Sequence, residues 1–161
     1  MHPRAAELVE RLGLRPHPEG GFYREIFRSN RRVQPFDARP PRTALTLIYF
    51  LLVDEGHSRW HRVRSDEAWS WVEGDALELF HMDAGLNAVT RMLLGAPAEG
   101  REAASVIPAK DWQAARTTGA YTLVTCAVGP GFEFADFAML SDLPDVAEEV
   151  ARRHPDAAGL I

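Results

Sequence analysis

The stretches GHSRWH, at Gly56–His61, and DEAWSWVEG, at Asp66–Gly74, decide how this chain folds. Both are interpreted as adjacent short strands, at the spacing that is typical of a β-barrel or sandwich. Residues two apart on a strand share a face, so we expect His61 and Glu67 to face inward on adjacent strands joined by a short turn. The two stretches therefore predict an imidazole and a carboxyl group at neighbouring points of one β-structure.

A third stretch, PAKDWQ, ends at Gln113 and adds an amide to this pair. We expect Gln113, His61 and Glu67 to converge on one hollow inside a small β-barrel. Trp69 and Trp71 share the predicted face of Glu67, so at least one indole is expected to line that hollow. Flat apolar walls with few polar groups suit sugars and other ring compounds.

An inward carboxyl group beside an imidazole has a pKa that is displaced by two opposing effects. Burial raises the pKa of Glu67, whereas a cation such as Arg59, predicted on the same face as His61, lowers it. Carboxyl and imidazole groups in such surroundings serve as general acids and bases. The sequence thus nominates His61 and Glu67 as catalytic groups, with Arg59 and Gln113 as ligand contacts.

Length and composition fit one globular domain. The chain has 161 residues, 46% of them hydrophobic, and a formal net charge of −5 at pH 7. The acidic excess and the scattered basic residues disfavour a nucleic-acid partner. No apolar run approaches the roughly 20 residues of a membrane helix, and the first residues lack a signal-peptide core. The single cysteine, Cys126, is expected to be a small buried hydrophobe, and a cytoplasmic protein follows.

The hydrophobic pattern predicts an all-β centre between two short helices. The helices are expected at Ala5–Leu12 and Asp142–Arg153, where apolar residues recur at helical spacing. Thr43–Val53 is nearly continuously apolar and predicts a long buried strand. Further strands are predicted at Phe22–Phe27, Ser58–Val63, Glu67–Val72, Ala76–Met82, Ala88–Leu94, Ala104–Ile107, Tyr121–Val128 and Phe132–Phe137. We interpret residues 1–161 as a single domain made of a helix and arm (1–42), a barrel (43–140) and a terminal helix (141–161).

The segment HPEGGFYRE, at His17–Glu25, gathers more functional groups than a plain loop needs. Two glycines in it allow the backbone to approach another element closely. Two interpretations stay open. In one, Glu19, Tyr23 or Arg24 closes the mouth of the hollow against an anionic or hydroxylated ligand. In the other, the segment is a proline-stiffened turn in which Glu19 caps the turn and Arg24 pairs with Glu25 across a strand.

Four motifs, in this order, resemble the cupin superfamily and, within it, the small branch known as cupin family five. They lie at His17–Glu25, Trp60–Trp69, Trp112–Arg116 and Pro130–Phe137, and the resemblance spans about residues 5–140. It implies a cupin-type double-stranded β-helix, which is a jelly-roll barrel and is commonly dimeric. A homodimer would also cover the long apolar strand and the open edge of a jelly roll.

The same resemblance places metal ligands where this chain carries other residues. Metal-binding cupins typically use three histidines and a glutamate, and the corresponding positions here are Arg59, His61, Glu67 and Gln113. Arg59 would repel a divalent metal, and an amide is a poor ligand for a transition metal. We therefore expect no cofactor, and the alternative is a weakly bound divalent ion on His61, Glu67 and Gln113.

Two classes of function stay open. In the first, the protein is an isomerase- or epimerase-like enzyme that needs no metal, with His61 and Glu67 moving protons while Gln113 and Arg59 hold a sugar or related polar molecule. In the second, the same residues bind a small ligand without turnover. A third, weaker alternative is a structural ion pair of His61 and Glu67 inside a dimer. The resemblance does not choose among these alternatives, because fold does not dictate chemistry.

Overall fold

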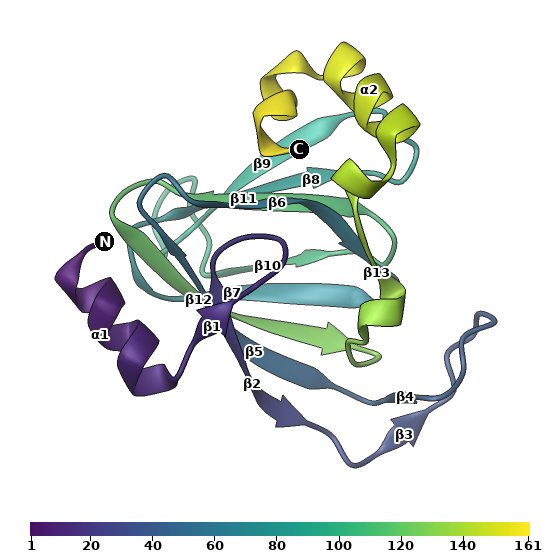
Figure 1. Cartoon of the computed structure of the whole chain (residues 1–161), viewed down its shortest axis with the longest axis horizontal. Coiled ribbons are helices and arrows are strands. Elements are labelled where there is room, and N and C mark those ends of the chain that lie inside the picture. The colour runs from purple at the N-terminus through teal and green to yellow at the C-terminus, as the bar shows by residue number, and fades with distance from the viewer.

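The computed structural model describes residues 1–161 and has two β-sheets packed face to face (Figure 1). The larger sheet contains six strands in the order β1-β2-β5-β12-β7-β10, and each neighbouring pair is antiparallel. Its strands are β1 (Arg15–Pro16), β2 (Phe22–Arg28), β5 (Thr46–Val53), β12 (Tyr121–Gly129), β7 (Asp66–Gly74) and β10 (Ala104–Ile107). This fold is the double-stranded β-helix that the sequence predicts.

The smaller sheet contains five strands in the order β13-β6-β11-β8-β9. Its strands are β13 (Phe137–Met139), β6 (His57–Val63), β11 (Trp112–Thr117), β8 (Leu77–Met82) and β9 (Val89–Leu94). Two further strands, β3 (Arg32–Val33) and β4 (Arg42–Thr43), pair with each other in a hairpin that projects from the barrel at the lower right of Figure 1.

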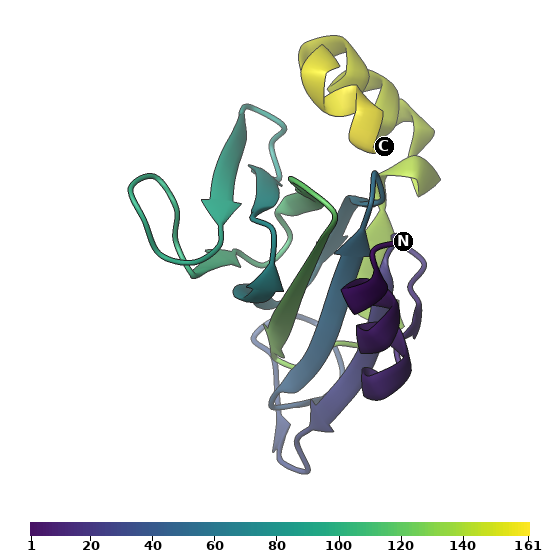
Figure 2. The same cartoon turned by 90° about the vertical axis from the view of Figure 1, so that its left-hand side faces the viewer.

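The two helices cover the outer faces of the sheets (Figure 2). α1 (Pro3–Leu12) packs on the larger sheet, where Leu8 joins a cluster with Leu51 and Leu123. α2 (Pro144–Arg153) packs on the smaller sheet, where Val150 contacts a cluster that includes Trp60. Burial of these apolar side chains, rather than helix propensity, stabilises helices as short as these. The helices of this chain are too short or too polar to cross a membrane.

Strand alternation on β6 divides two large side chains between the faces of the smaller sheet. Trp60 is fully buried on the outer face, and its indole N–H donates to the carbonyl oxygen of Ala157 at 2.9 Å. His61, the next residue, points into the barrel and is also buried. The predicted separation of these two side chains is therefore confirmed.

The structure corrects the predicted elements at three places. β11 was not predicted, because two alanines in it have low strand propensity; both are fully buried where β11 lies between β6 and β8. The strand predicted at Phe132–Phe137 is instead a loop and a 3-10 turn at Phe134–Asp136, and β13 begins only at Phe137. The long strand predicted from Thr43 begins at Thr46, since β4 already ends at Thr43.

Candidate active site in the barrel

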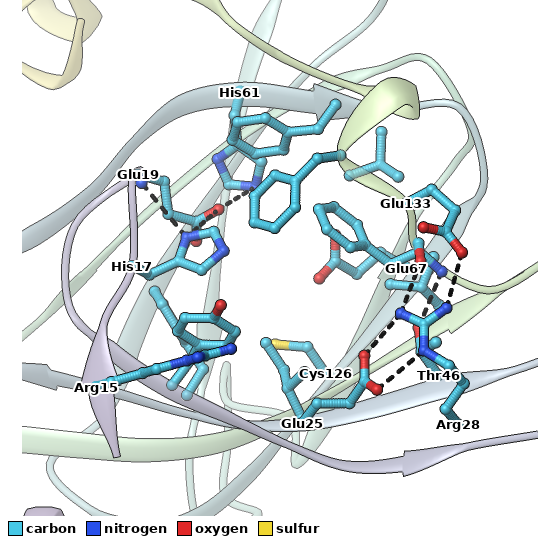
Figure 3. A pocket seen from close by; sticks show the side chains of 18 residues that line it. Arg15, His17, Glu19, Glu25, Arg28, Thr46, His61, Glu67, Cys126 and Glu133 are labelled. Atoms are coloured by element: carbon cyan, nitrogen blue, oxygen red, sulfur yellow. Dashed lines mark hydrogen bonds and ion pairs between the residues drawn. The ribbon is translucent and has the colours of Figure 1, made fainter.

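A cavity of about 240 Å³ opens between the two sheets at one end of the barrel (Figure 3). The arm that precedes β2 supplies Arg15, His17 and Glu19 to its lining, while β6 supplies His61 and β7 supplies Glu67. Phenylalanines from β5, β13 and the loop before β13 complete the wall. The sequence expectation that His61 and Glu67 face a shared interior space is confirmed.

Gln113 lies behind this cavity and connects the histidine to the glutamate. It pairs directly with His61 across the β11–β6 ladder. The Trp69 indole N–H donates to Gln113 Oε1 at 2.9 Å. Because an indole can only donate, this bond turns the amide nitrogen toward the site. Gln113 Nε2 then donates to Glu67 Oε2 at 2.5 Å and lies 3.0 Å from His61 Nε2.

The partners of His61 assign the tautomer of its ring. Nδ1 lies 2.7 Å from the carbonyl oxygen of Arg59, which can only accept, so Nδ1 carries the proton. Nε2 of the neutral ring therefore presents its lone pair to the site, where it can accept the Gln113 amide N–H. The predicted trio is therefore connected, since Gln113 contacts both His61 and Glu67, but only His61 and Glu67 line the cavity, and the expected ligand contact by Gln113 is not found.

The N-terminal arm brings a second carboxyl group to the same imidazole. Glu19 Oε2 lies 3.2 Å from His61 Nε2, and Glu19 Oε1 accepts the Ser58 hydroxyl at 2.8 Å. Gly20 permits this approach, since its φ is +117° and a Cβ there would lie 2.1 Å from the carbonyl oxygen of His57. The segment therefore lines the cavity, as in the first of the two interpretations, but Glu19 lies in the interior beside His61 and not at the mouth.

Burial gives both glutamates unusual acidities. It raises the pKa of Glu19 to about 8, although the Ser58 hydroxyl and the Arg59 charge oppose it. It raises the pKa of Glu67 to about 7, although the nearby His61 opposes it. Near neutral pH, Glu19 is thus mainly a carboxylic acid, while Glu67 is divided between its two protonation states.

Burial has the opposite effect on the histidines, since it disfavours their cationic form. It lowers the pKa of His61, and it lowers the pKa of His17 to about 4 with a contribution from His61. At neutral pH the 3.2 Å contact between Glu19 and His61 therefore joins a carboxylic acid and a neutral imidazole, not two ions.

The cavity walls are phenylalanines and a tyrosine, and the tryptophans lie elsewhere. Phe137 stacks on His61 with ring centroids 5.4 Å apart, and the other wall rings are Tyr23, Phe50, Phe132 and Phe134. Trp69 is buried deeper, behind Gln113, and Trp71 donates its N–H to Asp75 O near the far end of β7. The expectation that an indole lines the cavity is wrong, because Trp69 lies in the core behind Gln113 and Trp71 lies toward the far end of β7.

Of the remaining predicted ligand contacts, Tyr23, Arg59 and Arg24, only the first lines the cavity. Tyr23 lines the cavity, as expected. Arg59 does not, since its guanidinium donates to Pro18 O at 2.6 Å and thereby holds the arm. Arg24 follows Tyr23 on β2, is exposed and is absent from the lining, because alternate residues of a strand face opposite ways.

Several lining residues escaped prediction from the sequence. His17 lies among the rings, with its centroid 4.5 Å from that of Tyr23, and Cys126 is buried beside Glu67. Alternation from Tyr23 along β2 would have found the rim residue Glu25, and alternation along β12 would have found Cys126. No pattern would have found His17, because the arm before β2 has no period.

The donor set does not fit the metal site of the metal-binding cupins. Gln113 directs its N–H group, not its oxygen, at the site, and Arg59 holds the arm instead of supplying a ligand. No three histidine, cysteine, aspartate or glutamate side chains are grouped as they would be to hold an ion. The alternative of an ion on His61, Glu67 and Gln113 would require the amide to turn and to lose its bond from Trp69.

Comparisons with known proteins extend over almost the whole chain. The profile of a family described as "Cupin superfamily (DUF985)" matches residues 6–140. A hypothetical protein from Leishmania major is 30% identical over 98% of this chain and 96% of its own, with a TM-score of 0.85. A protein from Shewanella oneidensis is 29% identical over 97% of this chain and 93% of its own, with a TM-score of 0.80.

More distant structures share the fold alone. The oxalate decarboxylase of Lactobacillus farciminis, in a formate complex, is 14% identical with a TM-score of 0.59, over 87% of this chain and 38% of its own. No curated protein matches the sequence. The similarity therefore defines the architecture, and the chemistry must be argued from the residues of the cavity.

Proposed function

The chain belongs to the cupin superfamily, in the family described as DUF985, and from this premise we propose that it is an acid–base enzyme acting on a small polar molecule inside the barrel. One observation carries the proposal. A buried carboxyl group with a pKa of about 7, Glu67, lies close to a second buried acid, Glu19, and to an imidazole, His61, which is 3.2 Å from Glu19. A general base works best when its pKa lies near the working pH.

The arrangement suits an isomerase- or epimerase-type reaction, which removes a proton from a molecule and returns one to it. Glu67 in its carboxylate form would accept a proton from a C–H bond, leaving the electron pair on the ligand. Glu19 would supply a proton directly to the ligand, which thereby regains what it lost, and proton exchange with water at the open cavity would then return Glu67 to its carboxylate and Glu19 to its acid form. Gln113 would hold Glu67 in place through its N–H bond.

Exchange with heavy water tests the proposal on any molecule whose C–H bond the site can ionise. A library of small metabolites is incubated with the protein in ²H₂O, and mass spectrometry detects deuterium gained at carbon. We expect at least one compound to gain deuterium. Glu67→Gln should slow this exchange about a hundredfold or more, whereas Glu99→Gln, the same change at an exposed position, should leave it unchanged.

The second candidate is a binding module without turnover. It is favoured by the hydrogen bonds that already fix the polar groups of the site, in which Trp69 holds Gln113 and Gln113 holds Glu67. A compound that raises the melting temperature and is recovered without deuterium would support this candidate and contradict the enzyme. Exchange that continues at the normal rate in Glu67→Gln would remove Glu67 from the mechanism.

We further propose that two copies of the chain associate in a homodimer. β5 is paired on both sides within the chain, so it does not need cover from a partner. β2 is different, because β1 pairs with only Phe22 and Tyr23 and leaves the rest of that edge open beside the half-exposed Phe27. Light scattering at micromolar concentration should report twice the chain mass of 17.9 kDa, and a monomer would contradict the proposal.

A further inference from the structure

The charges that line the cavity are unevenly placed between its mouth and its interior. At the mouth, Arg28 is paired with Glu25 at 2.8 Å and with Glu133 at 2.9 Å, and Arg15 lies 5.1 Å from the centre of the Tyr23 ring. Both guanidiniums therefore already have partners. The interior presents carboxyl groups and no cationic side chain.

The interior carboxyl groups are close enough to act on one ligand. Glu19 and Glu67 are 6% and 7% exposed. Glu19 contacts His61 directly, and Glu67 is hydrogen-bonded to Gln113, which also contacts His61. The charges of the two carboxyl groups affect one another, since Glu19 contributes to the raised pKa of Glu67. A ligand that reaches His61 thus meets two carboxyl groups at once.

Aromatic rings surround the same space. Phe134 and Phe137 have centroids 6.1 Å apart and Phe132 lies 5.1 Å from Phe134, both in edge-to-face contact. His17 stacks toward Phe134 at 6.2 Å. Ring faces carry partial negative charge and attract cations, and aromatic cages bind ammonium groups in this way.

We propose that the ligand of this cavity is an organic cation, with a protonated amine between Glu19 and Glu67 and a compact apolar body against Phe132, Phe134 and Phe137. The inference rests on the proposed function because it concerns the same cavity, and it names the class of molecule that the cavity takes. An anion would have to displace its hydration beside two carboxyl groups without gaining a cationic partner. A neutral polar molecule would gain no attraction between charges from the two carboxyl groups.

A protonated amine would change the acidity of both glutamates. A positive charge beside Glu67 and Glu19 lowers the pKa of each, so Glu67, which has the lower pKa, loses its proton first, while Glu19 can keep the proton that it supplies in the proposed reaction. Binding must then release protons to the solvent and strengthen as the pH rises through 7 and 8, the pKa values of the two groups. An anionic ligand would have the opposite linkage, with proton uptake and weaker binding at higher pH.

Three probes of nearly equal size and shape separate these possibilities: benzylammonium, benzyl alcohol and benzoate. Calorimetry at pH 7.5, in two buffers with different ionisation enthalpies, measures the affinity and the number of protons released. We expect benzylammonium to bind at least about tenfold more tightly than the other two and to release up to about one proton. Glu67→Gln should weaken benzylammonium about tenfold and leave benzyl alcohol unchanged, and the exposed Glu99→Gln should change neither.

Equal or tighter binding of benzyl alcohol or benzoate would overturn the inference, as would proton uptake or no binding of benzylammonium at millimolar concentration. The two proposals fail separately. Proton-releasing binding of benzylammonium, with no deuterium exchange in any compound, would leave a cation-binding site without catalysis. Exchange that depends on Glu67, combined with a preference for the neutral or anionic probe, would leave an acid–base enzyme with another class of ligand.

Discussion

Two buried carboxyl clusters in this protein behave in opposite ways. Asp136, at the base of the β3–β4 hairpin, is 4% exposed and accepts bonds from Arg42 at 2.8 and 2.9 Å and from Arg39 at 3.1 Å. Its pKa is lowered, chiefly by Arg42. Glu19 and Glu67 are about equally buried but have no arginine bonded to them, and their pKa values are raised.

The comparison shows that the countercharge, not the depth of burial, decides what a buried carboxyl group does. Asp136 with its arginines is a fixed anion that ties the hairpin to the loop before β13. The cavity glutamates keep a proton that can leave near neutral pH. The first arrangement suits structure, whereas the second suits acid–base chemistry or a ligand that brings its own positive charge.

Removal of the charge of Asp136 should have the largest effect on stability. Asp136→Asn leaves the buried Arg42 without its anion and Arg39 with Asp37 alone, and we expect a loss of about 3 kcal/mol in the free energy of unfolding. Urea denaturation at pH 7 measures this loss. Glu149→Gln, at an exposed ion pair on α2, is the control and should cost less than about 1 kcal/mol. Equal losses of stability in the two variants would show that the buried charge of Asp136 contributes no more to folding than an exposed charge does.

The corresponding change at Glu67 should have the opposite sign. The folded pKa of about 7 lies above the ordinary value of 4.5, so the folded state keeps a proton that the unfolded chain has lost. The stability that this group contributes is therefore complete below pH 4.5 and is lost as the pH rises through 7. Glu67→Gln should raise stability by about 3 kcal/mol at pH 8.5, with a gain that shrinks toward pH 4.5.

The wild type supplies the companion measurement for Glu67→Gln. Its free energy of unfolding should fall by about 2 kcal/mol between pH 6.5 and 8.5, since Glu19 and Glu67 both titrate there. The histidines with lowered pKa values act in the other direction, but below pH 6.5. A destabilised Glu67→Gln variant at pH 8.5 would place Glu67 in the same class as Asp136.

Gly20→Ala should displace the N-terminal arm, the segment before β2, from the cavity. A Cβ at this position meets the carbonyl oxygen of His57 at 2.1 Å in a backbone with φ +117°, and we expect a loss of about 2 kcal/mol or more. If the arm moves, Glu19 returns to water and the pH dependence above pH 7 flattens. Gly159→Ala, which meets no atom within 4 Å, is the matched control. Unchanged stability in Gly20→Ala would mean that the arm accommodates a side chain without leaving the cavity.

The smallest expected effect concerns the indole that orients Gln113. Trp69→Phe removes the N–H that fixes the amide, and we expect a loss of about 1 kcal/mol together with a rise in the pKa of Glu67, which the Gln113 bond lowers. Trp71→Phe, which removes only the exposed bond to Asp75 O, is the control. An unchanged pKa of Glu67, followed by NMR titration, would show that Gln113 keeps its orientation without the indole.

Much of the fold followed from local pattern. Alternation on β6 and β7 placed His61 and Glu67 inside and Trp60 outside, because the period of a strand leaves each side chain one of two faces. Local pattern missed β11, which is held by its neighbours on both sides and not by its own propensity. It also extended a strand through Phe134–Asp136, where the buried Arg39 and Arg42 bind Asp136 in a 3-10 turn.

The sequence by itself determined the barrel, its two helices and the inward positions of His61 and Glu67, because these depend on periodicity, and motif order alone brought Gln113 to the pair. The tertiary structure alone decided that Glu19 reaches His61, that phenylalanines and not tryptophans form the walls, and that Arg59 holds the arm. Those features depend on an aperiodic arm and loop folding over the open end of the barrel. Their positions come from packing between distant segments, which no local spacing records.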